Sequence, residues 1–467
     1  MMSPTPTTLH DLSATELLAA YQRGVLSPVD VTRAVITHIE RWEPHLKATY
    51  AFDPEGALAM ARASEARWRR GEALALDGVP VMLKENIATR GVPTPLGTAA
   101  TELVPAEEDS PPAARLREAG AVFLGKTTMP DYGMLSSGLS SFHPLTRNPW
   151  DLRKNPGGSS AGAGAGVAAG YGPLHVGTDI GGSVRLPAGW CGIVTLKPSL
   201  GRIPIDPPYP ARVAGPMTRT VADTALMMGP LSRPDARDHM SLPWQDIAWD
   251  NLDRDVKGLR IGLHLDAGWG TPVAPEVRDA IVAASRAFEA AGAIVEPLAP
   301  WCDHAMIEGV DRFWRTRFWI ELRKLSAERR ERILPFIRTW AEGGGGWSGE
   351  DLFEAYSQTL AIRKATVDAT QPYDYVLSPT APMVAFDAEL PCPTNDVTRP
   401  FDHIAFTLAY NMSEQPAASI NAGYTAEGLP IGLQIAGRRF DDLGVLQMAR
   451  AWERLRPAQR PWPMPPA

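Results

Sequence analysis

Residues 156–201 read PGGSSAGAGAGVAAGYGPLHVGTDIGGSVRLPAGWCGIVTLKPSLG and decide the fold. Glycine, serine and alanine dominate this stretch, and charged residues almost vanish from it. A low-complexity linker is one interpretation. However, linkers do not carry apolar residues at regular intervals, as this stretch does at Val176, Ile180, Trp190, Ile193 and Leu196. The sequence therefore predicts a tightly packed core in which backbone runs close to backbone.

Strand-like and helix-like segments lie on both sides of this stretch. An apolar run over 79–83 predicts a buried strand that ends at Lys84. Apolar residues at helical spacing over 277–288 lie between strand-like runs at 259–263 and 293–295. This order predicts an α/β fold, in which one large α/β/α domain has a central twisted, mixed β-sheet covered by helices.

We expect this single domain to span residues 1–467. Within it, residues 60–230 are expected to form the catalytic core segment. Residues 300–370 are expected to form a variable helical region, or lid, that shapes the substrate pocket.

Composition excludes several classes of protein. The formal net charge of −7 argues against binding to nucleic acid, which favours basic proteins. The three cysteines, Cys191, Cys302 and Cys392, form no CxxC pair and no disulfide framework, which predicts a reducing compartment. Residues 1–24 lack the order of a signal peptide, and no apolar run is long enough to span a membrane. We expect a cytoplasmic monomer or homodimer with no metal and no cofactor.

Three short motifs match known patterns but lack the structural context that those patterns need. Residues 120–127 satisfy the phosphate-loop pattern GxxxxGK[ST], yet the interior, AVFL, itself predicts a strand. Residues 158–162 satisfy GxSxG, but no strand precedes them and no later histidine has a telling context. Residues 164–169 fit the dinucleotide pattern GxGxxA, again without a preceding strand. We therefore expect neither nucleotide binding nor a serine–histidine hydrolase.

The remaining functional signal lies in a few ordered segments. They read VPVMLKEN over 79–86, PGGSSAG over 156–162, GTDIGGSVRLP over 177–187 and NMSEQPAAS over 411–419. The two serines Ser159 and Ser183 are separated by 183 − 159 = 24 positions. In this order and spacing the segments resemble the amidase signature family over most of the chain. One departure is Ala161, where the family commonly has glycine.

The resemblance implies an amidase in which three side chains relay a proton. Ser183 attacks the carbonyl carbon, and Ser159, which in the family follows a cis peptide bond, passes the proton of Ser183 to Lys84. A serine hydroxyl needs such a base, and a lysine can act as one only when burial lowers its pKa from ~10.4. The residues alone leave two alternatives open, namely a surface position for Lys84 and a plain packing role for Ser159.

The glycines before Ser183 predict a site for negative charge. They leave backbone N–H groups free to converge on an oxyanion, namely those of Ile180, Gly181, Gly182 and Ser183. A plain Gly-Gly turn is the alternative. Asp179 and Arg185 flank the nucleophile with opposite charges, and we expect them to pair and brace the loop. Met134 matches a family segment that walls the acyl pocket, although core packing would equally explain it.

Eight large aromatic residues over 301–347 predict helices that cover an apolar pocket. We expect hydrolysis of a carboxamide C–N bond through a serine acyl-enzyme, on small apolar or aryl amides. Carbamates (urethanes) are chemically close substrates. One alternative is the amidase subunit of a glutamine-dependent amidotransferase, although its paired tyrosines and NLARYDG-like run have no equivalent in 300–350. The other alternative is a non-catalytic scaffold of the same fold.

Overall fold

The computed structural model describes residues 8–466. Part of the prediction that the chain has no leader falls on residues 1–7, which lie outside the described residues. Within the described part, the strands join into one sheet of eleven, in the spatial order β1-β3-β2-β4-β6-β5-β10-β11-β9-β7-β8. They are β1 (Thr49–Tyr50), β2 (Pro80–Lys84), β3 (Val122–Thr127), β4 (Leu174–Asp179), β5 (Val194–Lys197), β6 (Val213–Thr218), β7 (Arg260–Leu263), β8 (Ile294–Pro297), β9 (Tyr375–Pro379), β10 (Ala417–Tyr424) and β11 (Pro430–Gly437).

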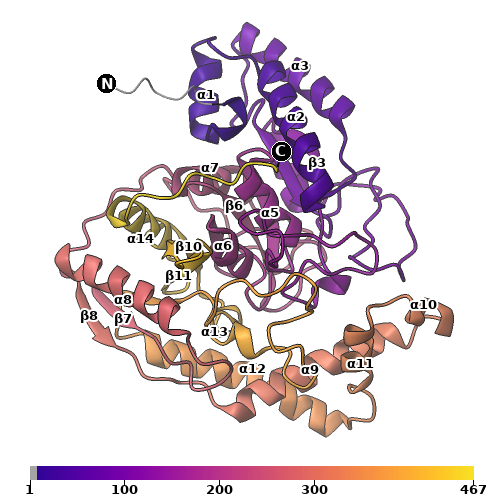
Figure 1. Cartoon of the computed structure of the whole chain (residues 1–467), viewed down its shortest axis with the longest axis vertical. Helices are drawn as coiled ribbons and strands as arrows, with labels where there is room; N and C mark the ends of the chain where they lie inside the picture. Colours follow the sequence, from indigo (N-terminus) through magenta and orange to yellow (C-terminus); the bar gives the residue numbers. More distant parts are fainter. Residues whose placement is uncertain (1–7, 467) are drawn as a thin grey trace.

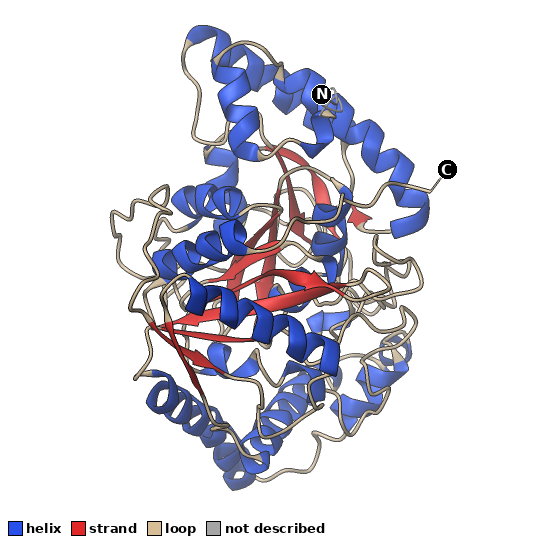
Figure 2. Ribbon diagram, turned by 60° about the vertical axis from the view of Figure 1, so that its left-hand side comes forward, coloured by secondary structure: helices blue, strands red, loops and turns tan. Residues whose placement is uncertain are grey.

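The sheet is mixed, as predicted. β2 runs parallel to β3 and β4, and β7 runs parallel to β8 and β9, whereas the other pairs are antiparallel. The two halves of the sheet meet where β5 pairs with β10, with Lys197 opposite Ala417 and Thr195 opposite Ser419. Figure 2 shows the strands running through the middle of the molecule with helices on either side. The predicted α/β class with a helix-covered sheet is therefore confirmed.

Fourteen α-helices surround the sheet in the described part of the chain. They are α1 (Ala14–Gln22), α2 (Pro28–Leu46), α3 (Pro54–Arg70), α4 (Pro111–Glu118), α5 (Ala161–Ala169), α6 (Arg185–Cys191), α7 (Val221–Leu231), α8 (Pro275–Ala290), α9 (His304–Leu322), α10 (Ala327–Glu331), α11 (Pro335–Glu342), α12 (Gly349–Thr370), α13 (Leu408–Met412) and α14 (Asp442–Leu455). Helices α2 and α3 lie at one end of the molecule, and α9 to α12 lie at the opposite end (Figure 1). Over the described residues, no helix combines the length and the apolar character needed to cross a membrane.

The glycine-rich stretch forms the centre of the molecule rather than a linker. All nine residues of α5 are buried, and this helix packs against α6 and β4. A Cβ on Gly162 would lie 2.2 Å from the backbone oxygen of Ala48, and one on Gly164 would lie 2.7 Å from Cβ of Pro187. Only glycine allows so close an approach of backbone to backbone, because any side chain would collide. The predicted tight packing of this stretch is therefore confirmed.

The parallel pairing of β2 with β4 sets the position of the candidate site residues. Leu83 pairs with Val176, so the two strands end at the same edge of the sheet. Lys84 is the last residue of β2, and Asp179 is the last residue of β4. Residues that follow the carboxyl ends of adjacent parallel strands meet at one edge, where α/β proteins place their ligands.

Candidate active site

Lys84 lies in the interior of the protein and contacts two hydroxyl groups. Its side chain is 0% exposed. Its Nζ lies 2.8 Å from Oγ of Ser159 and donates a hydrogen bond of 3.0 Å to Oγ1 of Thr178. Nδ2 of Asn86 donates a second hydrogen bond of 3.0 Å to the same threonine oxygen. The alternative of a surface lysine is therefore wrong, because the strand delivers Lys84 into the core.

Burial also sets the protonation of Lys84. Removal from water lowers the pKa of its amine to about 7. The carboxylates of Asp179 and Glu85 oppose this shift, whereas the guanidinium of Arg212 adds to it. A large fraction of a lysine with this pKa is neutral at neutral pH, and a neutral amine can accept a proton from a hydroxyl group.

Ser159 lies between this lysine and the loop that carries Ser183. Its side chain is 3% exposed, and a cis peptide bond joins Gly158 to it. A Cβ on Gly158 would lie 2.5 Å from the backbone nitrogen of Ser137, so the segment has room only for glycine there. The backbone N–H of Ser160 donates a 3.2 Å hydrogen bond to the carbonyl oxygen of Ser183, which ties the two serine segments together.

Ser183 follows β4 and lies at the wall of a cavity, here called the Ser183 cavity. Much of the wall is apolar: Met134, Leu135, Ile180, Trp314, Phe318, Phe401 and Ile404. Among the described residues, no hydrogen bond joins the hydroxyl of Ser183 to that of Ser159. Catalytic hydrogen bonds are often long or poorly aligned in ligand-free sites and tighten when substrate binds. The structure thus places Ser159 on Lys84 and Ser183 in the cavity.

The loop before Ser183 offers fewer free amides than the sequence predicted. Over residues 8–466, the N–H groups of Ile180, Gly181 and Ser183 have no hydrogen-bond acceptor. The N–H of Gly182, in contrast, donates a 2.8 Å hydrogen bond to Oδ1 of Asp179. The expectation that all four groups are free is therefore wrong for Gly182. The Asp179 carboxylate turns back onto its own loop and occupies that donor.

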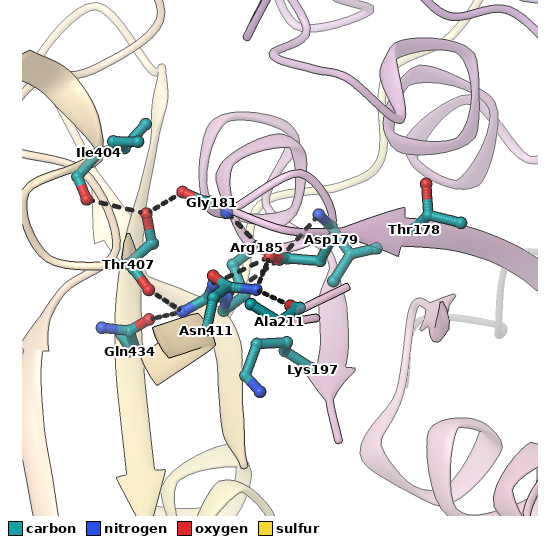
Figure 3. Close-up of polar contacts among 12 residues, drawn as sticks. Thr178, Asp179, Gly181, Arg185, Lys197, Ala211, Ile404, Thr407, Asn411 and Gln434 are labelled. Atoms are coloured by element: carbon teal, nitrogen blue, oxygen red, sulfur yellow. Dashed lines mark hydrogen bonds and ion pairs between the residues drawn. The ribbon is translucent and has the colours of Figure 1, made fainter. Parts of the chain in front are cut away.

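Asp179 and Arg185 form the predicted pair, and the pair is completely buried. The closest nitrogen and oxygen are 3.0 Å apart. Residues from distant segments complete the network (Figure 3). The Arg185 guanidinium donates to the carbonyl oxygen of Thr407 at 2.9 Å and to Oε1 of Gln434 at 2.8 Å. The side-chain amide of Asn411 donates to Oδ1 of Asp179 at 2.9 Å. Oγ1 of Thr407 also donates to the carbonyl oxygen of Gly181 at 2.6 Å. The network holds the loop that carries Ser183 against the second half of the chain.

Replacing the carboxylate of this pair is expected to destabilise the fold strongly. Asp179→Ala leaves the Arg185 guanidinium buried without its counter-ion, which costs about 3–5 kcal/mol of unfolding free energy. Urea denaturation followed by tryptophan fluorescence measures the difference. The matched control is Asp30→Ala, which breaks an exposed ion pair with Arg33 and should cost less than about 1 kcal/mol. A loss below about 1 kcal/mol for Asp179→Ala would contradict the bracing role.

Several residues of the site were not indicated by any sequence motif. Thr178 directly precedes Asp179, but nothing in the pattern marked it as the second partner of Lys84. His403 lines the Ser183 cavity at 1% exposure, although no motif surrounds it. Burial lowers its pKa to about 3, so the ring is neutral, and neither ring nitrogen has a partner among the described residues. Within the same residues, no cluster of three or more histidine, cysteine, aspartate or glutamate side chains could hold a metal ion.

Comparison with known proteins places this geometry in a family. A family model described as amidase matches residues 30–446. The chain is 36% identical to a glutamyl-tRNA(Gln) amidotransferase subunit of Myxococcus xanthus, over 96% of this chain and 97% of that protein. It is 35% identical to an acylamidase of Rhodococcus erythropolis, over 96% of both chains.

Solved structures agree with these matches. A bacterial aryl acylamidase of the amidase signature family superposes with a TM-score of 0.89 at 30% identity, covering 97% of this chain and 98% of that one. A 6-aminohexanoate cyclic dimer hydrolase superposes with a TM-score of 0.87 at 25% identity, over 97% and 99% of the two chains. The family match spans both the serine segments and the distant residues that brace them, and the chain therefore belongs to the amidase signature family.

Proposed function

We propose that this protein hydrolyses carboxamide C–N bonds through a serine acyl-enzyme, with Ser183 as nucleophile, Ser159 as proton relay and Lys84 as base. One observation carries the proposal: the amine of Lys84 is buried, has a pKa of about 7 and lies 2.8 Å from the hydroxyl of Ser159. Burial favours the neutral amine, and its contact with a hydroxyl group distinguishes Lys84 from Lys126 and Lys197, whose amines donate to backbone carbonyl oxygens.

The proposed reaction has two halves. In the first, Ser183 attacks the carbonyl carbon while Ser159 takes its proton and Lys84 takes that of Ser159. The N–H groups of Ile180 and Gly181, with that of Ser183 itself, donate to the oxyanion that forms. The proton then returns through Ser159 to the leaving amine, because an amine departs only when protonated. In the second half, water attacks the acyl-enzyme along the same relay and frees Ser183.

The proposed substrates are amides with an apolar or aryl acyl group, and carbamates as a related class. The wall of the Ser183 cavity supports this choice, since Trp314, Phe318 and Phe401 enclose it together with Met134 and Ile404. A wall of this kind binds apolar groups and excludes water. The similarity to an acylamidase and an aryl acylamidase supports the same substrate class. Residues 300–370 then act as the variable region that shapes the pocket.

A product-release screen on the purified chain tests the proposed function. Nitroanilides, primary amides and aryl carbamates would release an aniline, ammonia, or an alcohol with carbon dioxide and an amine. Release of the amine from at least one amide class, together with labelling by a fluorophosphonate serine probe, supports the proposal. A chain that releases none of these products and takes no label is instead a scaffold of the same fold.

The pH dependence of hydrolysis should report the protonation of Lys84. Only the neutral amine accepts a proton, so its active form predominates above the pKa of about 7. We expect kcat/KM for a neutral anilide to rise about tenfold per pH unit below pH 7 and to level off above about pH 8. Stopped assays from pH 5 to 9 measure the profile. A flat profile down to about pH 5 would contradict a lysine base.

The amidase subunit of an amidotransferase is the second candidate function. The 36% identity to the Myxococcus xanthus protein favours it. Under this alternative, the chain would release ammonia from glutamine and need partner subunits to deliver it. Rapid hydrolysis of anilides by the isolated chain, without activity on glutamine, would decide for the stand-alone amidase.

A further inference from the structure

A second cavity, larger and more polar in its lining, adjoins the Ser183 cavity. The two share the side chains of Arg317 and Phe318 in their walls. The second cavity also contains Thr178 and Asn86, which form the hydrogen-bonded group around Lys84. A molecule bound at Ser183 can therefore extend past Arg317 into a space that lies on the lysine side of the relay.

Two arginines of this second cavity have no carboxylate partner. Over residues 8–466, neither Arg212 nor Arg317 lies within 4.0 Å of an Asp or Glu oxygen. Arg212 donates to the carbonyl oxygen of Pro207, and its buried Nε has no hydrogen-bond partner in the described part of the chain. Both side chains also line a third cavity that opens beside the second. A third arginine of this cavity, Arg329, does have a carboxylate partner, because it forms an ion pair with Glu102 at 3.2 Å.

The nearby acidic residues offset the charge of this pair only in part: the carboxylates of Asp238 and Asp206 favour the charged form of Arg212, but neither lies within ion-pair distance of it. Glu321 is held 3.1 Å from Lys324, and Asp206 lies beyond ion-pair distance of both arginines. Burial and the nearby positive charge of Arg317 lower the pKa of Arg212 to about 10. Two arginine side chains that lie close together in a cavity repel each other. An anion bound between them would relieve this repulsion.

Packing accounts for only part of this arrangement. The guanidinium of Arg317 lies 3.8 Å from the centre of the Tyr209 ring and 5.2 Å from that of Phe318. These stacking contacts use the faces of the guanidinium and leave its N–H edge, which is the part that binds a carboxylate in a bidentate manner. Stacking thus holds Arg317 in one orientation at the boundary of the two cavities.

We propose that Arg212 and Arg317 form a subsite for a carboxylate on the amine part of the amide substrate. The inference rests on the proposed function. The acyl group occupies the apolar Ser183 cavity, so the leaving amine faces the relay that must protonate it. The second cavity contains the lysine side of that relay, and the two arginines lie in its wall. The substrate class is therefore an amide that joins an apolar acyl group to an aminocarboxylate.

Three anilides that differ in the position of the carboxylate test the subsite. They are 4-acetamidobenzoate, with the charge on the amine part, 4-methylacetanilide, with no charge, and N-phenylsuccinamate, with the charge on the acyl part. We expect the ratio of kcat/KM for 4-acetamidobenzoate to that for 4-methylacetanilide to fall about tenfold or more in Arg212→Gln and in Arg317→Gln. The rate on the neutral anilide serves as the internal reference for folding and chemistry.

The matched control is Arg323→Gln, which removes one positive charge from an exposed position just after α9. Its ratio should stay within about twofold of the unchanged protein. Arg317→Lys should recover only part of the preference, because an ammonium cannot form the bidentate contact. A second measurement is inhibition by 4-aminobenzoate, which should weaken about tenfold in both glutamine variants, whereas inhibition by aniline should not change.

Two results would overturn the inference. The first is an unchanged ratio in both glutamine variants, and the second is a loss confined to N-phenylsuccinamate, which would place the charge on the acyl side. These failures leave the proposed function intact as long as 4-methylacetanilide is hydrolysed. If neither anilides nor primary amides nor carbamates are hydrolysed, the proposed function fails, and 4-aminobenzoate binding measured by calorimetry still decides whether the subsite exists.

Discussion

Ser183→Ala is expected to lower kcat for anilide hydrolysis by about 10⁴- to 10⁶-fold, because it removes the oxygen that forms the acyl-enzyme in the proposed mechanism. Residual hydrolysis would come from substrate binding and the oxyanion donors alone. The variant should also lose labelling by a fluorophosphonate probe. Chromogenic anilide assays and gel fluorescence measure both effects.

A second buried serine provides the control for this change. Ser285 lies on α8, is 3% exposed and donates to the carbonyl oxygen of Val282 at 2.9 Å. Ser285→Ala removes an equivalent buried hydroxyl far from the cavity and should leave kcat within about twofold. Retention of full activity by Ser183→Ala would exclude the acyl-enzyme mechanism on this residue.

Lys84→Met is expected to combine a large loss of activity with no loss of stability. Removal of the proposed base should lower kcat/KM by about 10²- to 10⁴-fold. The folded protein, however, no longer has to hold an amine in an environment that lowers its pKa from 10.5 to about 7. The unfolding temperature should therefore stay equal or rise. The rise of activity with pH near 7 should disappear from the residual rate.

Lys126 provides a matched lysine for this experiment. Burial lowers its pKa to about 8, as it does for Lys84, but its Nζ donates to the carbonyl oxygen of Ile87 at 2.7 Å and contacts no serine among the described residues. Lys126→Met should therefore keep kcat/KM within about threefold. Equal losses in Lys84→Met and Lys126→Met would indicate a general effect of buried lysines on the fold and would contradict the relay.

Local patterns sufficed for the parts of this protein that lie close together in the sequence. The apolar run before Lys84 predicted a strand that ends in the core, and the glycines around α5 predicted packing without side chains. The pairing of Asp179 with Arg185 also followed from local order, since the two are six positions apart. Such features depend on backbone geometry and hydrogen bonds within one segment.

Other parts of the site depend on contacts that no local pattern encodes. Arg185 reaches Thr407 and Gln434, which follow it by more than 220 positions. The wall residues Phe401, His403 and Ile404 belong to a short turn whose sequence has no periodicity. These positions follow from how distant segments pack, so the sequence alone could not predict them. The wrong expectation for Gly182 has a different origin: Asp179 lies only three positions before it, and the direction of the Asp179 side chain decides which amides stay free.

The proposed catalytic residues and the α9 residues of the cavity wall lie in separate segments of the chain, and this separation has a consequence for evolution. The proposed catalytic groups lie in residues 84–183. Trp314 and Phe318 of the cavity wall lie on α9, and the residues that hold Arg185 lie at 407–434. Mutations in α9 to α12 can therefore accumulate without disturbing the hydrogen bonds around Lys84. One catalytic apparatus can in this way acquire new substrates by drift or recombination in residues 304–370. The same segment is the one to randomise in the laboratory when a different amide is the goal.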